Sequence, residues 1–445
     1  MASDDRRDDL ANKATRLGLR AVNRFAGLPI VDKLGLRKPA EKILYEGTRL
    51  GFQGASVLAR SVGKAQKLVA PARPEASRSA GLFDLTPTDD QQMLREAAAD
   101  FATEQLRPAA LAADSACAAP AQVLEGIDSL GIASLSIPEA FGGIGSARSA
   151  VTHTLIYEAL AHGDMSLAVA GLAPTAVAHA LVLWGDPAQQ AMYLPAFAGE
   201  KMPVAALAIT EPHALFDPLA LQTRARKDGN DYIISGVKAL VPRADQAELL
   251  IVAATVEELG PALFLIEGGR KGVSFSAEPA MGLRAASTQR LHLDKVRVPK
   301  SALLAGDDVM VYRECLRLSR LGWCALVCGT AQAALDYVIP YVNERSAFGE
   351  PISHRQSVAF TVANIGIELE GMRLATWRAA SRAEQGLDFA HATALARRLC
   401  ADKGMQIGSD AVQLLGGHGF IKEHPVERWY RDLRAAAFMD GVVLV

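Results

Sequence analysis

The chain has 445 residues, half of them apolar and 22% charged, with a formal net charge of −2. This length is too great for one simple core and predicts about two to four domains. The composition is typical of a soluble globular protein, and its charge gives no reason to expect nucleic-acid binding.

The five cysteines show no paired framework. Cys324 and Cys328 are four residues apart in an apolar run. We predict buried free thiols there rather than metal ligands, because no His or Cys partner is close in sequence. No apolar run approaches the length of a membrane span. The acidic start of the chain argues against a secretory signal or a transit peptide, so we expect a cytoplasmic protein.

Residues 1–81 are predicted to form a basic helical extension and a linker. Residues 1–70 contain 14 Lys and Arg against 7 Asp and Glu. Apolar residues at helical spacing between 10 and 25 run beside the basic stripe Lys13, Arg16, Arg20 and Arg24, and a second segment of this kind covers about 50–68. Two hypotheses remain open. The extension is an arm packed on the body or on a neighbouring subunit, or residues 10–68 are a peripheral contact to an anionic membrane surface.

The next predicted domain, residues 82–202, is helical. Thr88 and Gln91 have the spacing of a capping box at its first helix. Helical patterning continues to about residue 201, and we expect breaks at 138–143 and at Pro174. Residues 203–309 change to short β-rich runs at 232–236, 249–253, 262–266 and 291–296, which predict a small barrel or sandwich. Long helical patterns return in residues 310–445. The expected fold class is therefore α+β.

Nine short segments in this order resemble the acyl-CoA dehydrogenase family, and the resemblance covers about residues 83–445. They are PEAFGG at 138–143, YLP at 193–195, ITEP at 209–212, DG at 228–229, GVK at 236–238, MGLR at 281–284, VRVP at 296–299, RSAFG at 345–349 and the run 413–432. The resemblance implies an N-terminal helical domain, a central small β domain and a C-terminal four-helix bundle. It also implies an FAD-dependent enzyme of fatty acid and lipid metabolism.

Asp440 is the predicted catalytic residue. It is a single carboxylate in the mostly apolar segment 435–445, and such a group is paired, neutral or catalytic. The resemblance makes it the base that removes the α-proton of an acyl-CoA, with Gly441 beside the substrate. The family usually has Glu here, and Asp is one methylene shorter, about 1.5 Å. The alternative is a capping or ion-paired carboxylate near the end of the chain.

Some branches of the family carry the base on the preceding helix instead, just before an arginine that meets the CoA moiety. These positions are Ser319 and Arg320 in this chain. A serine hydroxyl cannot serve as this base, so Asp440 is the sole candidate, and Arg320 is predicted to bind substrate.

The cofactor residues implied by the resemblance fall into two groups. Ile209 and Thr210 match the positions at the pyrimidine edge of the flavin. The adenine and pyrophosphate side, which the family takes from a neighbouring subunit, is represented by Arg345, Phe348, Gln356, Gln413 and Gly417. Departures from the family pattern are concentrated on the flavin side, at Leu215, Phe216, Leu240, Pro242 and Val442. We therefore predict that FAD binds, but more weakly than is usual.

The expected function is FAD-dependent α,β-dehydrogenation of an acyl-CoA to a trans-2-enoyl-CoA, with electrons passed to an electron-transfer flavoprotein. A split FAD site implies a homodimer or homotetramer. The alternative is a catalytically degenerate family member, acting as a scaffold or as a partner subunit of a heteromeric or membrane-associated complex.

Overall fold

The computed structural model describes residues 85–145, 149–199, 201–306, 308–440 and 444–445. The chain divides into two units, Met1–Leu82 and Phe83–Val445. The predicted basic stripe and the possible membrane contact at 10–68 lie outside the described residues, as do Gly441 and Val442.

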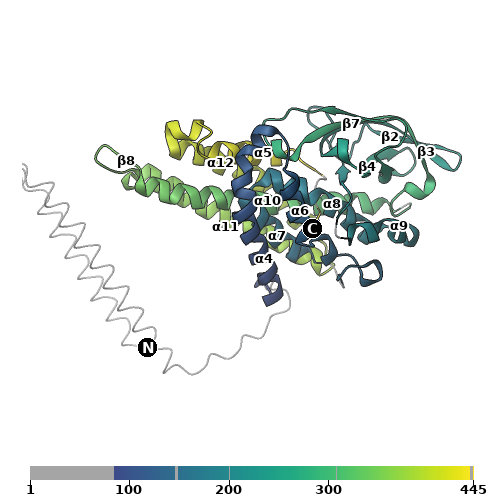
Figure 1. The fold of residues 1–445 in the computed structure, drawn as a ribbon, viewed down its shortest axis with the longest axis horizontal. Helices are drawn as coiled ribbons and strands as arrows, with labels where there is room; N and C mark the ends of the chain where they lie inside the picture. Colours follow the sequence, from purple (N-terminus) through teal and green to yellow (C-terminus); the bar gives the residue numbers. More distant parts are fainter. Residues whose placement is uncertain (1–84, 146–148, 200, 307, 441–443) are drawn as a thin grey trace, which may run out of the picture. The chain divides into compact units, whose positions relative to one another are not determined.

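The first block of the described part is helical (Figure 1). It contains α4 (Asp89–Phe101), a π-helical turn (Ala102–Leu106), α5 (Arg107–Ala116), α6 (Ala121–Ser129), α7 (Ala150–Gly163), α8 (Met165–Trp184) and α9 (Pro187–Phe197). The capping box at the start of α4 is confirmed, with the Thr88 hydroxyl and the Gln91 side chain each accepting from the other's backbone N–H.

The predicted break at Pro174 is wrong, because α8 runs through it. Proline lacks the N–H that would bind the carbonyl four residues earlier, which normally weakens a helix. Here that carbonyl, Ala170 O, faces the Arg243 guanidinium, whose Nη1 lies 3.5 Å away. Ala170 and Pro174 are also buried, so packing around the helix opposes a kink.

A curled sheet of seven strands follows. The strands are β1 (Ala205–Ala208), β2 (Arg224–Asp228), β3 (Asp231–Pro242), β4 (Leu249–Val256), β5 (Gly260–Glu267), β6 (Val273–Ala277) and β7 (Thr288–Pro299). Their order is β1-β4-β2-β3-β7-β6, with β5 paired to β4. All four β-rich runs predicted from the sequence lie within β3, β4, β5 and β7.

Both faces of β4 are buried. Along β4, Leu249, Ile251 and Ala253 belong to the main core shared with the helices. The alternate residues Leu250 and Val252 belong to a second core enclosed by the sheet. This two-residue period is what a strand imposes, and it attaches the sheet to the helical body through β1, β4 and β5.

The last block returns to helices. It contains α10 (Val309–Glu344), the hairpin of β8 (Ser346–Ala347) and β9 (Glu350–Pro351), α11 (Gln356–Glu384), α12 (Ala390–Leu415), the turn η8 (Gly416–Phe420) and α13 (Val426–Ala436). Helix α10 packs against α7, α11 and α12, and α12 packs against α13. The β8–β9 hairpin lies at the end of the α10–α11 pair, far from the sheet (Figure 1). The predicted α+β fold class is confirmed.

Helices α8 and α10 are long and apolar enough to cross a membrane by length and composition alone. Their most apolar stretches are 89% and 61% buried inside the described fold. Burial within the protein therefore accounts for their apolar character.

Candidate active site

Asp440 lies four residues beyond the end of α13 and is only 8% exposed. Its Oδ1 accepts a hydrogen bond from Arg320 Nε on α10 at 3.0 Å. A second guanidinium, Arg397 of α12, has Nη2 at 3.9 Å from the same oxygen. The carboxylate is therefore held between two arginines that come from two different helices.

The backbone of Asp440 is joined to the end of β1. Thr210 Oγ1 donates to Asp440 O at 3.3 Å, and Thr210 O accepts from Ala239 N at 2.9 Å. Ile209 and Thr210 are both buried. The structure thus brings together three predicted site residues, Thr210, Asp440 and Arg320, from segments far apart in the sequence.

A buried ion pair supports this strand end. Lys238 is fully buried, and its Nζ donates to Ile209 O at 3.1 Å and to Glu211 Oε1 at 2.8 Å. Burial lowers the pKa of Lys238 to about 8, although Glu211 opposes the shift. Burial tends to raise the pKa of Glu211, but Lys238 and hydrogen bonds from Gln222 and Thr223 bring it below the usual value. The pair fixes the Ile209 carbonyl and so orients the peptide leading into Thr210.

A mostly apolar cavity of about 210 Å³ is formed in part by the segment that leads into Asp440, although Asp440 is not among its lining residues. The preceding residue, Met439, forms part of its wall, and Leu240 projects from a β-bulge in β3. Leu240 has the left-handed φ of 55°, and its N–H donates to Glu278 Oε2 at 2.5 Å. The other lining residues are Ala280, Met281, Gly282, Leu283, Thr288, Arg431, Arg434, Ala435 and Phe438.

Two residues that line this cavity, Leu240 and Leu283, have positive φ, of 55° and 54°. Such conformations cost of order 1–3 kcal/mol each and occur at ligand sites. They are compatible with a binding function here.

Helix α13 holds one wall of the cavity through backbone contacts. Asp432 Oδ1 accepts from Leu283 N at 2.6 Å, and Arg431 Nη1 donates to Met281 O at 2.9 Å. A Cβ at Gly282 would lie 2.3 Å from Arg431 O, so only glycine fits. Burial, with the nearby Asp164 carboxylate, raises the pKa of Asp432 to about 8. The wall therefore contains a carboxyl group that burial favours in its neutral form.

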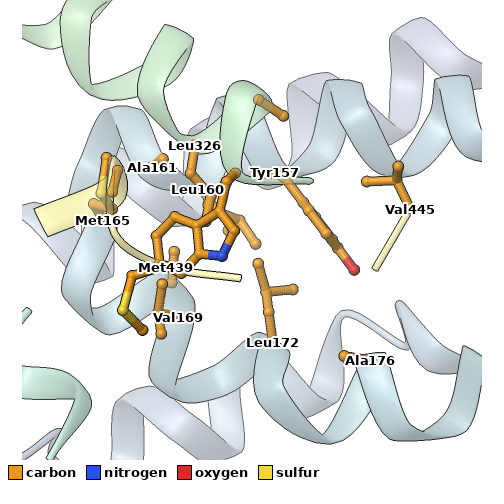
Figure 2. Packing of buried hydrophobic residues seen from close by; sticks show 14 of the residues in the cluster. Tyr157, Leu160, Ala161, Met165, Val169, Leu172, Ala176, Leu326, Met439 and Val445 are labelled. Atoms are coloured by element: carbon orange, nitrogen blue, oxygen red, sulfur yellow. The ribbon is translucent and has the colours of Figure 1, made fainter. Parts of the chain in front are cut away.

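The two residues that follow 441–443 are anchored in the core. Leu444 O accepts from Tyr157 OH at 2.8 Å and lies 3.2 Å from Nδ1 of His179. Met439, Tyr157 and Val445 belong to one buried cluster with residues of α7 and α8 (Figure 2). The chain on both sides of residues 441–443 is thus fixed to the helical core.

The residues predicted for the adenine and pyrophosphate side lie elsewhere, near the hairpin end of α10. Arg345 follows the last residue of α10, Phe348 is 96% exposed in the hairpin and Gln356 begins α11. Gln413 and Gly417 are exposed at the end of α12 and in η8. Tyr341 connects the two segments, since its hydroxyl lies 3.3 Å from Leu415 O and 2.8 Å from His418 Nδ1.

Within one chain, these residues cannot share a cofactor molecule with Asp440. Arg320 and Arg345 are separated by 25 residues, essentially all of them in α10. At the rise of an α-helix this is about 37 Å. The predicted cofactor residues therefore form two separate half-sites.

Other important residues were not predicted. Arg397, Lys238, Glu278 and Asp432 carried no function in the sequence-based prediction, yet they hold Asp440, Ile209, Leu240 and Leu283 in place. Lys238 and Asp432 lie in GVK and in the run 413–432, two of the segments that carry the family resemblance, whereas Arg397 and Glu278 lie in none of these segments. Ser319 is fully buried on α10. His418 lies in the glycine turn η8, and its ring stacks on the ring of His424, with centroids 5.1 Å apart.

The residues around Asp440 fit the flavin end of FAD. The cavity presents apolar side chains for a flat ring, and Asp440, whose carbonyl accepts from Thr210, directly follows the lining residue Met439 in the chain. The far half-site offers an exposed cation and an exposed aromatic ring, Arg345 and Phe348, and open space above Gly417. These groups suit the diphosphate and adenine of the same cofactor.

Comparison with known families gives three matches in chain order. They are the acyl-CoA dehydrogenase N-terminal domain at residues 88–201, the middle domain at 206–296 and the C-terminal domain at 309–443. The chain is 31% identical over 362 residues to the short-chain specific acyl-CoA dehydrogenase of Bos taurus, covering 79% of this chain and 87% of the relative. It is 32% identical to the short/branched chain specific enzyme of the same organism, covering 80% and 83%.

Solved structures agree with these matches. Butyryl-CoA dehydrogenase from Megasphaera elsdenii superimposes with a TM-score of 0.73 at 28% identity, covering 80% of this chain and 95% of that one. A chain from a study of the electron transferring flavoprotein of Acidaminococcus fermentans gives the same TM-score at 30% identity, with coverages of 80% and 94%.

Proposed function

The chain belongs to the acyl-CoA dehydrogenase family, and we propose that it converts an acyl-CoA thioester to a trans-2-enoyl-CoA. It is a flavoprotein oxidoreductase acting on CH–CH groups, with FAD as cofactor. In the proposed reaction, the α-carbon loses a proton, the β-carbon loses a hydride, and a carbon–carbon double bond forms between them. When bound, FAD supplies the acceptor for the hydride and its electron pair.

The observation that carries the proposal is the position of the Asp440 carboxylate. It is largely buried, one residue beyond the cavity wall, and its backbone is bound to Thr210 at the end of β1. A base and a hydride acceptor must act on adjacent carbons of one substrate, so they must lie on the same small site. Asp440 is the carboxylate that we propose as the base, as the resemblance to the family implies.

Arg320 holds Asp440 before substrate arrives. A base whose Oδ1 accepts from a guanidinium at 3.0 Å has to be released before that oxygen takes a proton. The Arg320 side chain is 32% exposed, whereas the Asp440 side chain is 10% exposed. We infer that an anionic group of the CoA moiety draws Arg320 outward and frees the carboxylate, which assigns a substrate-binding role to Arg320.

A second subunit completes the cofactor site in this proposal. The two half-sites are about 37 Å apart along α10, too far for one dinucleotide held at both ends. We infer a homodimer or homotetramer in which one chain supplies the Asp440 side and its neighbour supplies Arg345, Phe348, Gln356, Gln413 and Gly417. An electron-transfer flavoprotein is the proposed electron acceptor, supported by the structural relative from a study of such a protein.

The proposed location is cytoplasmic, and the peripheral membrane contact through residues 10–68 remains a proposal. The support is the reduced state of the cysteines, since all five are free thiols. The predicted burial of Cys324 and Cys328 is confirmed.

The test is anaerobic mixing of the FAD-loaded protein with acyl-CoA thioesters of different chain length and branching. We expect the flavin absorbance to bleach with at least one thioester and a trans-2-enoyl-CoA to appear in equal amount. Tightly bound flavin that no acyl-CoA bleaches would contradict the proposed reaction. That outcome would favour the scaffold hypothesis.

A further inference from the structure

Arg397 is the most heavily engaged side chain around Asp440. It extends from α12, and its Nη1 donates to Ala436 O at 2.7 Å. Its Nη2 donates to Ala437 O at 2.8 Å and to Met439 O at 3.1 Å. The same Nη2 lies 3.9 Å from Asp440 Oδ1. One guanidinium thus contacts three backbone carbonyls and the carboxylate of the residue that follows them.

These carbonyls need a partner because α13 ends at Ala436. The last carbonyls of a helix have no intrahelical donor, and the helix dipole favours a cation at this end. A planar guanidinium with five N–H groups can serve several carbonyls at once, which a lysine ammonium does with less fixed geometry. Arg397 therefore determines how the chain turns from α13 toward Asp440.

The two arginines at Asp440 differ in their freedom to move. Arg320 makes one hydrogen bond among the described residues, to Asp440, and its side chain is 32% exposed. The Arg397 side chain is 14% exposed and is bound to three carbonyls. Arg320 can leave the carboxylate at the cost of one contact, whereas Arg397 cannot leave without releasing the segment that carries Asp440.

We propose that Arg397 is a positioning residue for the proposed base: it fixes the backbone from which Asp440 extends and keeps a cation beside the carboxylate after Arg320 turns to the substrate. The proposal rests on the proposed function in one respect, that Asp440 removes the α-proton. Position matters more for Asp than for a longer side chain, because an error of about 1 Å can cost roughly 10²-fold in rate.

The experiment measures proton removal without turnover. The flavin of the FAD-loaded protein is first reduced with dithionite, so that it cannot accept a hydride. The protein is then incubated with an acyl-CoA in D₂O, and mass spectrometry follows deuterium entry at the α-carbon. Arg397→Met and Arg397→Lys are compared with Arg398→Met, a matched control because Arg398 is the next residue but is 81% exposed and pairs with Asp402. FAD content, melting temperature and the substrate concentration for half-maximal exchange are recorded for each variant.

We expect Arg397→Met to lower the exchange rate at saturating substrate by roughly 10²-fold, with little change in half-saturation. Arg397→Lys keeps the charge without the planar fork, so it should remain folded and lose about tenfold, a partial rescue. Arg398→Met should exchange at the unmodified rate. If Arg397→Met does not fold, Arg397→Lys decides the question.

Exchange within twofold of the unmodified protein in both Arg397 variants, or an equal loss in Arg398→Met, overturns the inference. Asp440→Asn separates this failure from a failure of the proposed function. If Asp440→Asn stops exchange while the Arg397 variants do not, only the positioning role is wrong. If Asp440→Asn exchanges normally, the assignment of the base is wrong as well.

Discussion

The two half-sites differ in how complete they are within one chain. In the half-site at Asp440, three residues make a defined contact with the carboxylate or the backbone of Asp440. They are Arg320, Arg397 and Thr210. At the hairpin end of α10, Phe348 is 96% exposed, and a Cβ on Gly417 would meet nothing within 4 Å. Groups that take part in the reaction need a fixed geometry, so the fold of a single chain holds them. Residues that bind the far end of the cofactor can be completed by a second subunit.

The largest expected effect comes from breaking the complete half-site. Asp440→Asn keeps the shape of the side chain but removes the base, so anaerobic flavin reduction by acyl-CoA should slow by about 10³-fold. FAD content should remain unchanged. Rapid mixing with absorbance detection measures both. A variant that reduces its flavin as fast as the unmodified protein would show that Asp440 is not the base.

Asp440→Glu is the companion measurement. It restores the family's usual reach, and the rate should rise if the short side chain is a defect. If the backbone that Arg397 holds already places the shorter Asp side chain at the correct distance, the longer Glu side chain would collide with the thioester and the rate should fall.

The next prediction tests whether the exposed half-site serves a neighbouring chain. Arg345→Gln combined with Phe348→Ala should raise the FAD dissociation constant about 10–100-fold, because a charge-assisted contact and a stacking surface are lost. Titration of apoprotein with FAD measures this. Since Arg345 and Phe348 are both exposed in the described fold, the melting temperature of the apoprotein should be unaffected.

A hybrid oligomer makes the same comparison sharper. Chains carrying Asp440→Asn are co-expressed, under a different tag, with chains carrying the Arg345 and Phe348 changes, and mixed oligomers are purified through both tags. If each site combines two chains, every mixed pair contains one fully intact site and regains about half of the unmodified activity. If each chain builds its own site, the hybrids remain as inactive as either parent.

A third prediction concerns the wall that α13 forms beside the cavity. The folded pKa of Asp432 is raised to about 8 by burial and by Asp164. A raised carboxyl pKa contributes stability that is full below the unfolded value near 4 and is lost as pH rises through 8. Between pH 6 and 9 the unmodified protein should therefore lose about 2–3 kcal/mol relative to Asp432→Asn. Urea unfolding at several pH values measures the difference; parallel pH profiles would contradict it.

Much of the fold could be predicted from the sequence because its elements follow local periodicity. The runs that became β3, β4, β5 and β7 alternate or are continuously apolar. Strand β2 was missed because four of its five residues are charged and only Ala225 is buried. The break predicted at Pro174 is wrong, because Arg243, 73 residues away from Ala170, lies close to the carbonyl that the proline leaves without a donor.

The site was predictable as a set of residues but not as an arrangement. Asp440, Thr210 and Arg320 were recognisable from motifs in order along the chain. Their partners were not, since Arg320 and Thr210 are 120 and 230 residues from Asp440, and Arg397 has no motif of its own. Contacts of this kind depend on how α10, α12 and β1 pack, which local pattern does not encode.

The smallest predicted effect comes from a substitution at Leu240, one of the residues of the flavin side that depart from the family pattern. Leu240 leaves the sheet at a bulge with φ of 55° and lines a cavity of about 210 Å³. If the ring of FAD occupies this cavity, Leu240→Trp should add an aromatic surface against it and tighten FAD binding about three- to tenfold. Met192→Trp on α9 is the control, because it adds the same side chain at a 69% exposed position away from the cavity. Titration of both apoproteins with FAD gives the comparison. Weaker binding by Leu240→Trp at an unchanged melting temperature would mean that the indole fills the cavity in place of the cofactor. In that case, the smaller side chain of Leu240 leaves space for the flavin ring and is not a lost contact.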